Sequence, residues 1–333
     1  MPLSEFDGRF ALITEEVEST EDSFAADVSE GFSSSPKRLS CRFFYDGEGS
    51  KLFDDITKLP EYYLTSAGVE ILASRADEIA SVFEDEVTLV ELGSGSAVKT
   101  QHLIDALLER QDRLRFVPVD ISAEVIEASS PSLLRSYPGL EVLGVAAEYR
   151  AGLKKIRELE GPRLILWLGS NVGNFERKEA ARFLGHIGEQ MTDRDRLLMG
   201  VDLRKDRSVL EAAYDDSQGV TARFNLNLLE RINKELGGQF EVDRFRHRAV
   251  YNEDVGRVEM YLGSTCAQTV RIEDLDLDVP FEKGEEIHTE NSYKYSLDEI
   301  DTLADAARMQ IERRWLDTRG LFSKNLLKIR NAR

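Results

Sequence analysis

Residues 87–95, VTLVELGSG, constrain the fold of this chain more than any other stretch. An apolar, β-branched run ends at the acid Glu91, and a Gly-Ser-Gly turn follows at once. The next residues, SAVKTQHLIDALLER, carry apolar side chains at helical spacing. The pattern predicts a strand, a tight glycine turn and a helix. Such a turn lets a ligand approach the backbone at the carboxyl edge of a parallel sheet. A loop that only connects two elements is the alternative interpretation.

Strands and helices are expected to alternate as far as Asp202. Further strands are predicted at residues 116–119, 141–146, 164–168 and 197–201, and helices at 99–110, 123–137, 153–159 and 178–191. This alternation predicts an α/β fold, with a parallel sheet and helices on both faces. After Asp202 the pattern predicts helices in 208–236, a strand pair in 257–272, a helix at 297–307, and strands at 311–316 and 321–329.

The break in this alternation predicts a second, α+β unit. We expect an accessory substrate-binding domain at residues 203–292, and a Rossmann-like domain from 71–202 and 293–333. Residues 1–70 are expected to contribute to the accessory domain. Within them, 1–35 are acidic and Ser-rich, which predicts a loosely structured lead-in. Residues 38–72 are rich in aromatics, which either fold over a site or are ordinary core residues.

Charge and composition exclude several classes of function. The 43 basic and 62 acidic residues give a net charge of −19, which argues against a nucleic-acid or anionic-membrane partner. No apolar run approaches the length of a membrane span, and no secretory signal is apparent. The two cysteines, Cys41 and Cys266, have no neighbours at metal-ligand spacing, so we expect no metal site. We therefore expect a cytoplasmic protein, monomeric, acting on a small molecule.

Acidic residues at three strand ends indicate the kind of ligand. Asp120 follows the second strand, where a carboxylate suits the hydroxyls of a ribose. Glu148 and Tyr149 follow the third, where an acid and an aromatic suit an adenine. The turn lacks the third glycine of a dinucleotide fingerprint, and the chain has no P-loop motif. Glu91, just before the turn, suits a cationic amine better than a diphosphate, which points to S-adenosylmethionine.

A second polar cluster, WLGSNVGNF at residues 167–175, follows the fourth strand. Its asparagines can accept from an ammonium and donate to a carboxylate. Asparagines in glycine-rich turns are also common simply as turn formers.

Together these segments resemble a known family. The set FFYDGEGSKLFDDITKLPEYY, VELGSG, FVPVDIS, YPGLEV, LGSNVGNF, YDDSQGVTARFNLNLLERIN, VEMYL, EEIHTENSYKY and WLDTRGLF is similar to the histidine N-alpha-methyltransferases of ergothioneine biosynthesis. The resemblance runs in order from about Arg38 to Phe322. It implies a class I methyltransferase fold, S-adenosylmethionine as methyl donor, and methylation of the α-amine of L-histidine to the trimethylated betaine hercynine.

The resemblance also implies roles for individual residues. Donor-binding positions are Gly93, Lys99, Asp120, Glu148 and Tyr149; Glu148 departs from the family's usual Asp. The positions that hold the substrate's amine and carboxylate are Tyr45, Tyr62, Gly169, Asn174 and Tyr214. The wall that meets the imidazole ring is Met260, Glu290 and Ser292.

Tyr45 and Asn174 are the expected catalytic residues, because their hydrogen bonds can orient the amine toward the methyl group. Glu290 with Ser292 is interpreted as an acceptor pair for a ring N–H, which selects an azole. A solvated Glu290 and a plain core Met260 remain the structural alternatives. As functional alternatives, the enzyme acts on another amino acid, such as a tryptophan derivative, or the chain is a non-catalytic sensor of an adenosine ligand.

Overall fold

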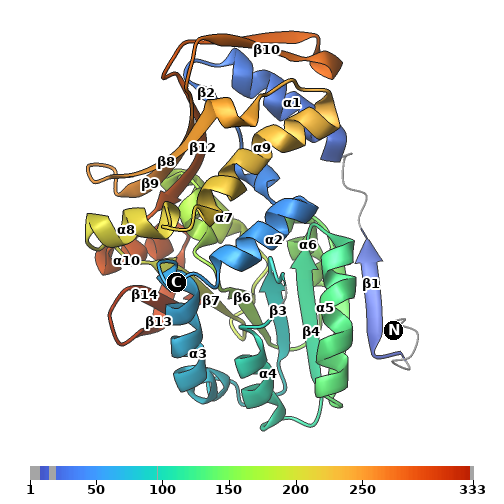
Figure 1. The fold of residues 1–333 in the computed structure, drawn as a ribbon. Coiled ribbons are helices and arrows are strands. Elements are labelled where there is room, and N and C mark those ends of the chain that lie inside the picture. The colour runs from blue at the N-terminus through green and yellow to red at the C-terminus, as the bar shows by residue number, and fades with distance from the viewer. Residues whose placement is uncertain (1–7, 15–19, 96, 331–333) are drawn as a thin grey trace.

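A computed structural model describes residues 8–14, 20–95 and 97–330, and its centre is an eight-stranded sheet (Figure 1). The strands lie in the order β1 (Phe10–Thr14), β5 (Leu140–Ala146), β4 (Leu114–Asp120), β3 (Thr88–Leu92), β6 (Arg163–Trp167), β7 (Arg196–Asp202), β14 (Phe322–Ile329) and β13 (Met309–Leu316). Neighbours from β1 to β7 pair in parallel, whereas β14 and β13 are antiparallel. The predicted parallel sheet is therefore confirmed, and the two C-terminal strands extend it as a mixed sheet.

Helices cover both faces of this sheet, as the alternation predicts. One face carries α3 (Tyr63–Ala80), α4 (Gln101–Leu108) and α5 (Ala123–Ser136); the other carries α6 (Tyr149–Arg157), α7 (Arg177–Glu189) and α10 (Leu297–Ala306). Successive strand residues point to opposite faces, so Leu89 packs with the first group and Val90 with the second. Such two-sided burial explains why the central strands are mostly apolar.

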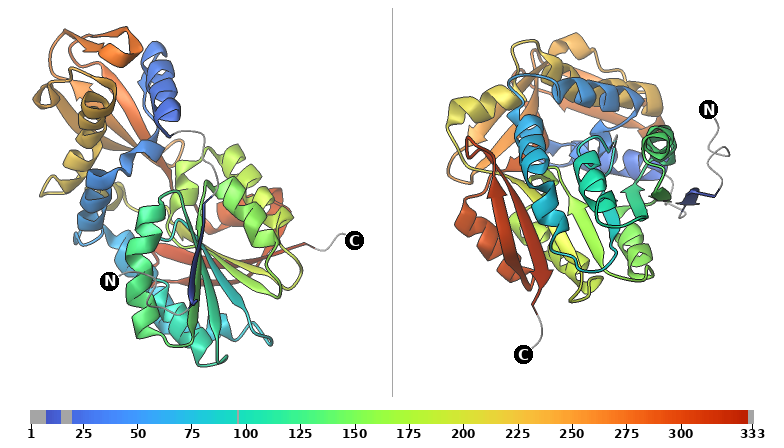
Figure 2. Two further views of the ribbon diagram at one scale, coloured as in Figure 1. Left: turned by 90° about the vertical axis from the view of Figure 1, so that its right-hand side faces the viewer. Right: turned by 90° about the horizontal axis from the view of Figure 1, so that it is seen from below.

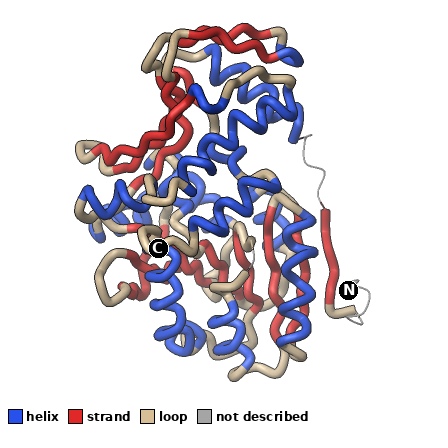
Figure 3. Tube along the Cα trace, viewed as in Figure 1, coloured by secondary structure: helices blue, strands red, loops and turns tan. Residues whose placement is uncertain are grey.

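A second layer lies at one end of the large sheet (Figures 1 and 2). It contains a four-stranded sheet of β2 (Lys37–Arg38), β12 (Glu286–Tyr293), β9 (Arg257–Ser264) and β8 (Phe245–Asn252), and a hairpin of β10 (Gln268–Ile272) and β11 (Leu277–Phe281). Figure 3 shows these strands apart from those of the large sheet. Four helices accompany them, α1 (Thr20–Ser33), α2 (Gly47–Ile56), α8 (Arg207–Tyr214) and α9 (Val220–Leu236).

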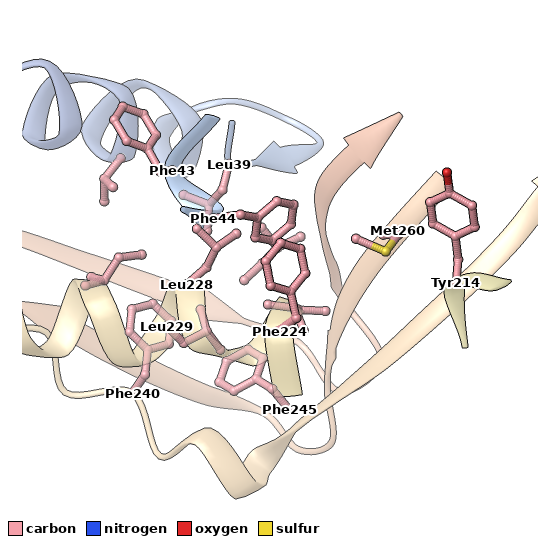
Figure 4. Close-up of a cluster of buried hydrophobic side chains, with 14 of the residues drawn as sticks. Leu39, Phe43, Phe44, Tyr214, Phe224, Leu228, Leu229, Phe240, Phe245 and Met260 are labelled. Atoms are coloured by element: carbon pink, nitrogen blue, oxygen red, sulfur yellow. The ribbon is translucent and has the colours of Figure 1, made fainter. Parts of the chain in front are cut away.

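The core of this layer is aromatic and lies around α9 (Figure 4). Phe224, Leu228 and Ile232 recur every fourth residue and form the buried stripe of the helix. The ring of Phe44 packs on Phe224 with a centroid distance of 4.5 Å. Phe44 comes from the aromatic segment that precedes the first predicted strand, so this part of the segment serves as core.

The expectation of a loosely structured lead-in is wrong for the described N-terminal residues. Strand β1 pairs with β5 at the edge of the large sheet, and α1 buries Phe24, Val28 and Phe32 at helical spacing. The predicted strand pair at 257–272 is also wrong, because β9 and β10 belong to different sheets. The domain boundaries at 70, 202 and 292 stay a prediction.

One buried ion pair lies at the start of β6 and β7. Arg163 Nη2 lies 2.5 Å from the Asp195 carboxylate, and both side chains are almost completely buried. Asp195 also accepts from the Thr192 backbone, which fixes the turn that leads into β7. In the described part of the chain, no helix is both long and apolar enough to cross a membrane.

Candidate functional site

The glycine turn after β3 has a backbone that only glycine adopts easily. Gly93 has φ +69° and Gly95 has φ +49°, both in the left-handed region. A Cβ atom on Gly93 would lie 2.7 Å from the Tyr149 hydroxyl oxygen. The turn therefore lies against the end of the Tyr149 side chain, so Tyr149 reaches this edge of the sheet from α6.

Asp120, at the end of β4, is held against the same turn. Its carboxylate accepts from the backbone N–H of Gly95 at 3.3 Å and of Ser122 at 3.2 Å. Burial raises the pKa of Asp120, while these N–H groups oppose that change. The side chain is thus fixed at the carboxyl edge, where the ribose position was predicted.

Glu91 is buried and Lys99 is half-buried beside the turn, and each influences the ionisation of the other. The Glu91 carboxylate accepts from Thr100 Oγ1 at 2.6 Å, and burial raises its pKa to about 7. Burial lowers the pKa of Lys99, and Glu91 opposes that shift. A carboxylate and an amine at this place can hold the two ends of an amino-acid tail.

The predicted adenine residues are placed differently from one another. Glu148 is exposed at the N-cap of α6, whereas the Tyr149 ring packs against Phe183 of α7 with a centroid distance of 5.6 Å. The structure therefore brings Gly93, Asp120 and Tyr149 together, whereas the Glu148 side chain is exposed to solvent.

A cavity that is partly open to solvent lies between the two layers. Its lining includes almost all of the predicted substrate residues, namely Tyr45, Tyr62, Asn174, Tyr214, Met260, Glu290 and Ser292. Gly169 is outside the lining, but a Cβ atom there would lie 2.9 Å from Asn171 Oδ1, and Asn171 lines the cavity. Asn171 Nδ2 lies 3.8 Å from the Cβ position of Gly93, so the cavity and the glycine turn meet at this residue.

Ends of helices and neighbouring strands position these side chains. Tyr45 follows the 3-10 helix Cys41–Phe44, Tyr62 is the N-cap of α3, and Tyr214 ends α8. Met260 of β9 lies opposite Glu290 of β12 in the antiparallel register. Met260 and Tyr214 lie together at one end of the aromatic cluster (Figure 4).

Sequence reasoning missed several lining residues. They are Phe53, Ile56, Leu64, Ser170, Asn171, Ala213, Thr221 and Phe224. Most are apolar residues of helical stripes, whose pattern cannot distinguish a core from a pocket wall. Ser170 and Asn171 lie within the polar cluster at residues 167–175, and their place in that cluster is the sequence signal that could have identified them.

The electrostatics of the cavity centre on Glu290. This side chain is half-buried because it faces the cavity, yet protein surrounds it closely. Burial raises its pKa to about 7, while Lys294 and a hydrogen bond from Asn174 oppose the shift. Burial also keeps the pKa of Tyr62 and Tyr214 well above 10, so both remain neutral hydroxyls.

A buried network lies beneath the cavity floor and was not predicted. Asp202, at the end of β7, contacts Lys294 at 2.8 Å and Lys205 at 2.5 Å. The Tyr63 hydroxyl donates to the same carboxylate at 2.9 Å. The Lys294 ammonium also donates hydrogen bonds to Tyr214 and Ser292, which line the cavity. Across the described residues, no group of three or more His, Cys, Asp or Glu side chains is arranged to hold a metal ion.

Comparisons with known proteins point to one family. The model of a family described as histidine-specific, SAM-dependent methyltransferases matches residues 24–329. The histidine N-alpha-methyltransferase of Mycobacterium tuberculosis (strain CDC 1551 / Oshkosh) is 44% identical over 90% of this chain and 93% of its own length. That of Mycolicibacterium smegmatis is 40% identical over 93% of this chain and 96% of its own length. Ergothioneine biosynthesis protein 1 of Neurospora crassa is 31% identical over 84% of this chain and 32% of its own length.

Proposed function

The chain belongs to the SAM-dependent, histidine-specific methyltransferases, and we propose that it methylates the α-amine of L-histidine as part of ergothioneine biosynthesis. The resemblance drawn from the sequence is thereby confirmed at the level of the family, and with it S-adenosylmethionine as methyl donor. The observation that best supports histidine as the substrate is the cavity, where Glu290 lies opposite Met260 and beside Asn174. This wall offers a carboxylate to a ring N–H among aromatic, apolar and uncharged polar side chains.

The carboxyl edge of the large sheet fits the donor. We propose that Gly93, Lys99, Asp120, Glu148 and Tyr149 hold it. The left-handed turn leaves no room for a side chain at Gly93, and the buried Ser94 hydroxyl has no hydrogen-bond partner within the described residues. A bound ligand that carries polar groups would satisfy this hydroxyl. S-adenosylmethionine bound by these residues would supply an electrophilic methyl group.

The chain's own residues then position the nucleophile. We propose that Tyr45 and Asn174 hydrogen-bond the substrate's α-amine in its unprotonated form, so that its lone pair faces the methyl group. Tyr45 lines the cavity, and burial of its hydroxyl raises its pKa, so it stays a neutral group that can donate or accept a hydrogen bond. Tyr62, Gly169 and Tyr214 hold the amine and carboxylate end, and Met260, Glu290 and Ser292 meet the ring. Since Asn171 joins the cavity to the glycine turn, the two ligands would meet there.

The proposal also covers the number of methylations, the oligomeric state and the cellular environment. We propose three successive methylations, which give the betaine hercynine, by a monomeric cytoplasmic enzyme that has neither a nucleic-acid nor a membrane partner. The net charge of −19 and two free cysteines support this environment. We propose that the four-stranded sheet with its helices acts as the accessory unit that closes the pocket.

Product masses test the function. The protein is incubated with S-adenosylmethionine and each amino acid in turn, and products are read by mass spectrometry. Histidine should gain one, two and three methyl groups, whereas leucine should gain none. Equal conversion of histidine and leucine would contradict the imidazole assignment. Preferred conversion of a tryptophan derivative would favour the alternative substrate, and binding of S-adenosylmethionine without turnover of any amino acid would favour a sensor.

A further inference from the structure

Lys294 is a completely buried lysine whose hydrogen-bonding capacity is fully used. Its ammonium contacts the Asp202 carboxylate at 2.8 Å, the Tyr214 hydroxyl at 2.8 Å and Ser292 Oγ at 2.9 Å. An ammonium has three N–H donors and no acceptor, so each donor has one partner here. Tyr214 and Ser292 therefore both accept from Lys294.

The two hydroxyls are also bonded to each other. Tyr214 OH and Ser292 Oγ lie 2.8 Å apart, so one of them donates to the other. A phenol is the stronger acid, which favours Tyr214 as the donor. Ser292 Oγ then accepts from Lys294 and from Tyr214, and both of its lone pairs are filled. The one remaining function of Ser292 is to donate its own proton, and Ser292 lines the cavity.

This direction matters because Glu290 lies two residues away on the same strand. Residues two apart on a strand share one face and are about 6.6 Å apart along it. Both side chains line the cavity. Above its pKa, Glu290 can only accept a hydrogen bond, so the wall presents an acceptor and a donor side by side.

We propose that Lys294 is a positioning residue that compels Ser292 to donate, so that the wall recognises a ring with one N–H and one bare nitrogen, as in neutral imidazole. The inference rests on the proposed function. It replaces the interpretation of Glu290 and Ser292 as an acceptor pair. An imidazolium has no bare nitrogen and an indole has one N–H alone, so neither satisfies both groups.

Lys205 provides a matched control. It bonds the same Asp202 carboxylate from the other side and is nearly as buried, but its remaining contacts are Tyr63 and the Leu203 carbonyl rather than the cavity hydroxyls. Losing Lys205 removes a buried charge from the network and leaves the bonds of Ser292 in place.

The test uses ring analogues of histidine. The 2- and 3-pyrrolylalanines keep a ring N–H and lack the bare nitrogen. Calorimetry measures their binding and that of histidine to the protein saturated with S-adenosylhomocysteine. The wild type should bind histidine at least about tenfold more tightly than the better pyrrole. Lys294→Met should lose most of this preference and keep its affinity for S-adenosylhomocysteine, whereas Lys205→Met should keep the preference.

Several outcomes overturn the proposal. They are an unchanged preference in Lys294→Met, an equal loss in Lys205→Met, and a wild type that binds the pyrroles as tightly as histidine. If Lys294→Met fails to fold, Ser292→Ala replaces it in the test, because this change removes the proposed donor and leaves the buried charges in place. A Ser292→Ala variant that still prefers histidine to the pyrroles would also overturn the proposal. A wild type that methylates no histidine refutes the proposed function instead, and the mass assay detects that separately.

Discussion

Replacing Glu290 with glutamine removes a charge from the cavity and keeps the size of the side chain. The carboxylate accepts the ring N–H in the proposed complex, and burial raises its pKa to about 7. A raised pKa means that the carboxyl group is protonated below about pH 7 and charged above it. The acceptor that histidine needs is therefore fully present on the alkaline side and is lost as the pH falls.

The size of both effects follows from this arrangement. Hydrogen bonds to charged groups contribute about 1.5–3 kcal/mol, which corresponds to roughly 10- to 150-fold in kcat/KM. Glu290→Gln should lose this factor for histidine at pH 8.5. At pH 6, only about one-tenth of Glu290 is ionised in the wild type. The wild-type kcat/KM should therefore be about tenfold lower at pH 6 than at a pH where Glu290 is fully ionised. The glutamine variant lacks that titration, and its log kcat/KM should have a slope one unit smaller below pH 7.

The assay is initial rate against pH, because kcat/KM reports ionisations of the free enzyme. Deprotonation of the substrate amine steepens both profiles equally, so the difference in slope isolates Glu290. Glu286→Gln, on the same strand but paired with Arg248 rather than lining the cavity, should leave the profile unchanged. Equal slopes in the wild type and Glu290→Gln would refute the reasoning, as would a parallel loss of affinity for S-adenosylhomocysteine.

Three further changes test other parts of the structure. Asp120→Ala should weaken S-adenosylhomocysteine binding by about 1.5–3 kcal/mol, since it removes a charged acceptor; unchanged affinity in calorimetry would contradict the ribose assignment. Asp195→Ala should lower the free energy of unfolding by about 3–5 kcal/mol, because it leaves the buried Arg163 guanidinium without its counter-ion. Urea denaturation compares this variant with Asp193→Ala, at an exposed position, and similar free energies of unfolding for the two variants would contradict the prediction. Replacing Met260 and Glu290 with an apolar pair should shift preference from histidine toward tryptophan; competition between the two substrates measures this, and an unchanged ratio would speak against their role.

The central sheet was predictable because its signals are local. A buried parallel strand is a short apolar run, and a glycine turn followed by a 3.6-residue period marks the next helix. These signals placed β3 and the Gly93 turn, and they also placed Asp120 at the edge. The N-terminal elements were missed for the same reason. Phe24 and Val28 are correctly spaced, but they lie in an acidic, Ser-rich stretch whose composition indicated a loose segment.

Strand β12 shows what a pattern alone could not provide. Its residues EIHTENSY alternate weakly, because the face that carries Glu290 and Ser292 is polar and lines a cavity. The resemblance to a family singled out both residues, whereas periodicity did not. The pairing of Glu290 with Met260 depends on the antiparallel register of two strands, which one chain's sequence leaves open.

Lys294 could not be predicted, because a lysine in a sequence indicates surface, and complete burial needs partners from elsewhere in the fold. Those partners meet where the two layers join. Asp202 ends β7 of the large sheet, and its backbone carbonyl accepts from Tyr295 at 3.1 Å, directly after the chain leaves β12. A buried ion pair seldom stabilises a fold more than apolar packing would, but it requires a defined geometry. Here the pair lies at the joint between the layers and also sets the direction of the Ser292 proton. A movement of one layer against the other would therefore alter the hydrogen bonds that Lys294 makes to Tyr214 and Ser292, so the position of the second layer and the hydrogen bonds of the cavity wall depend on each other.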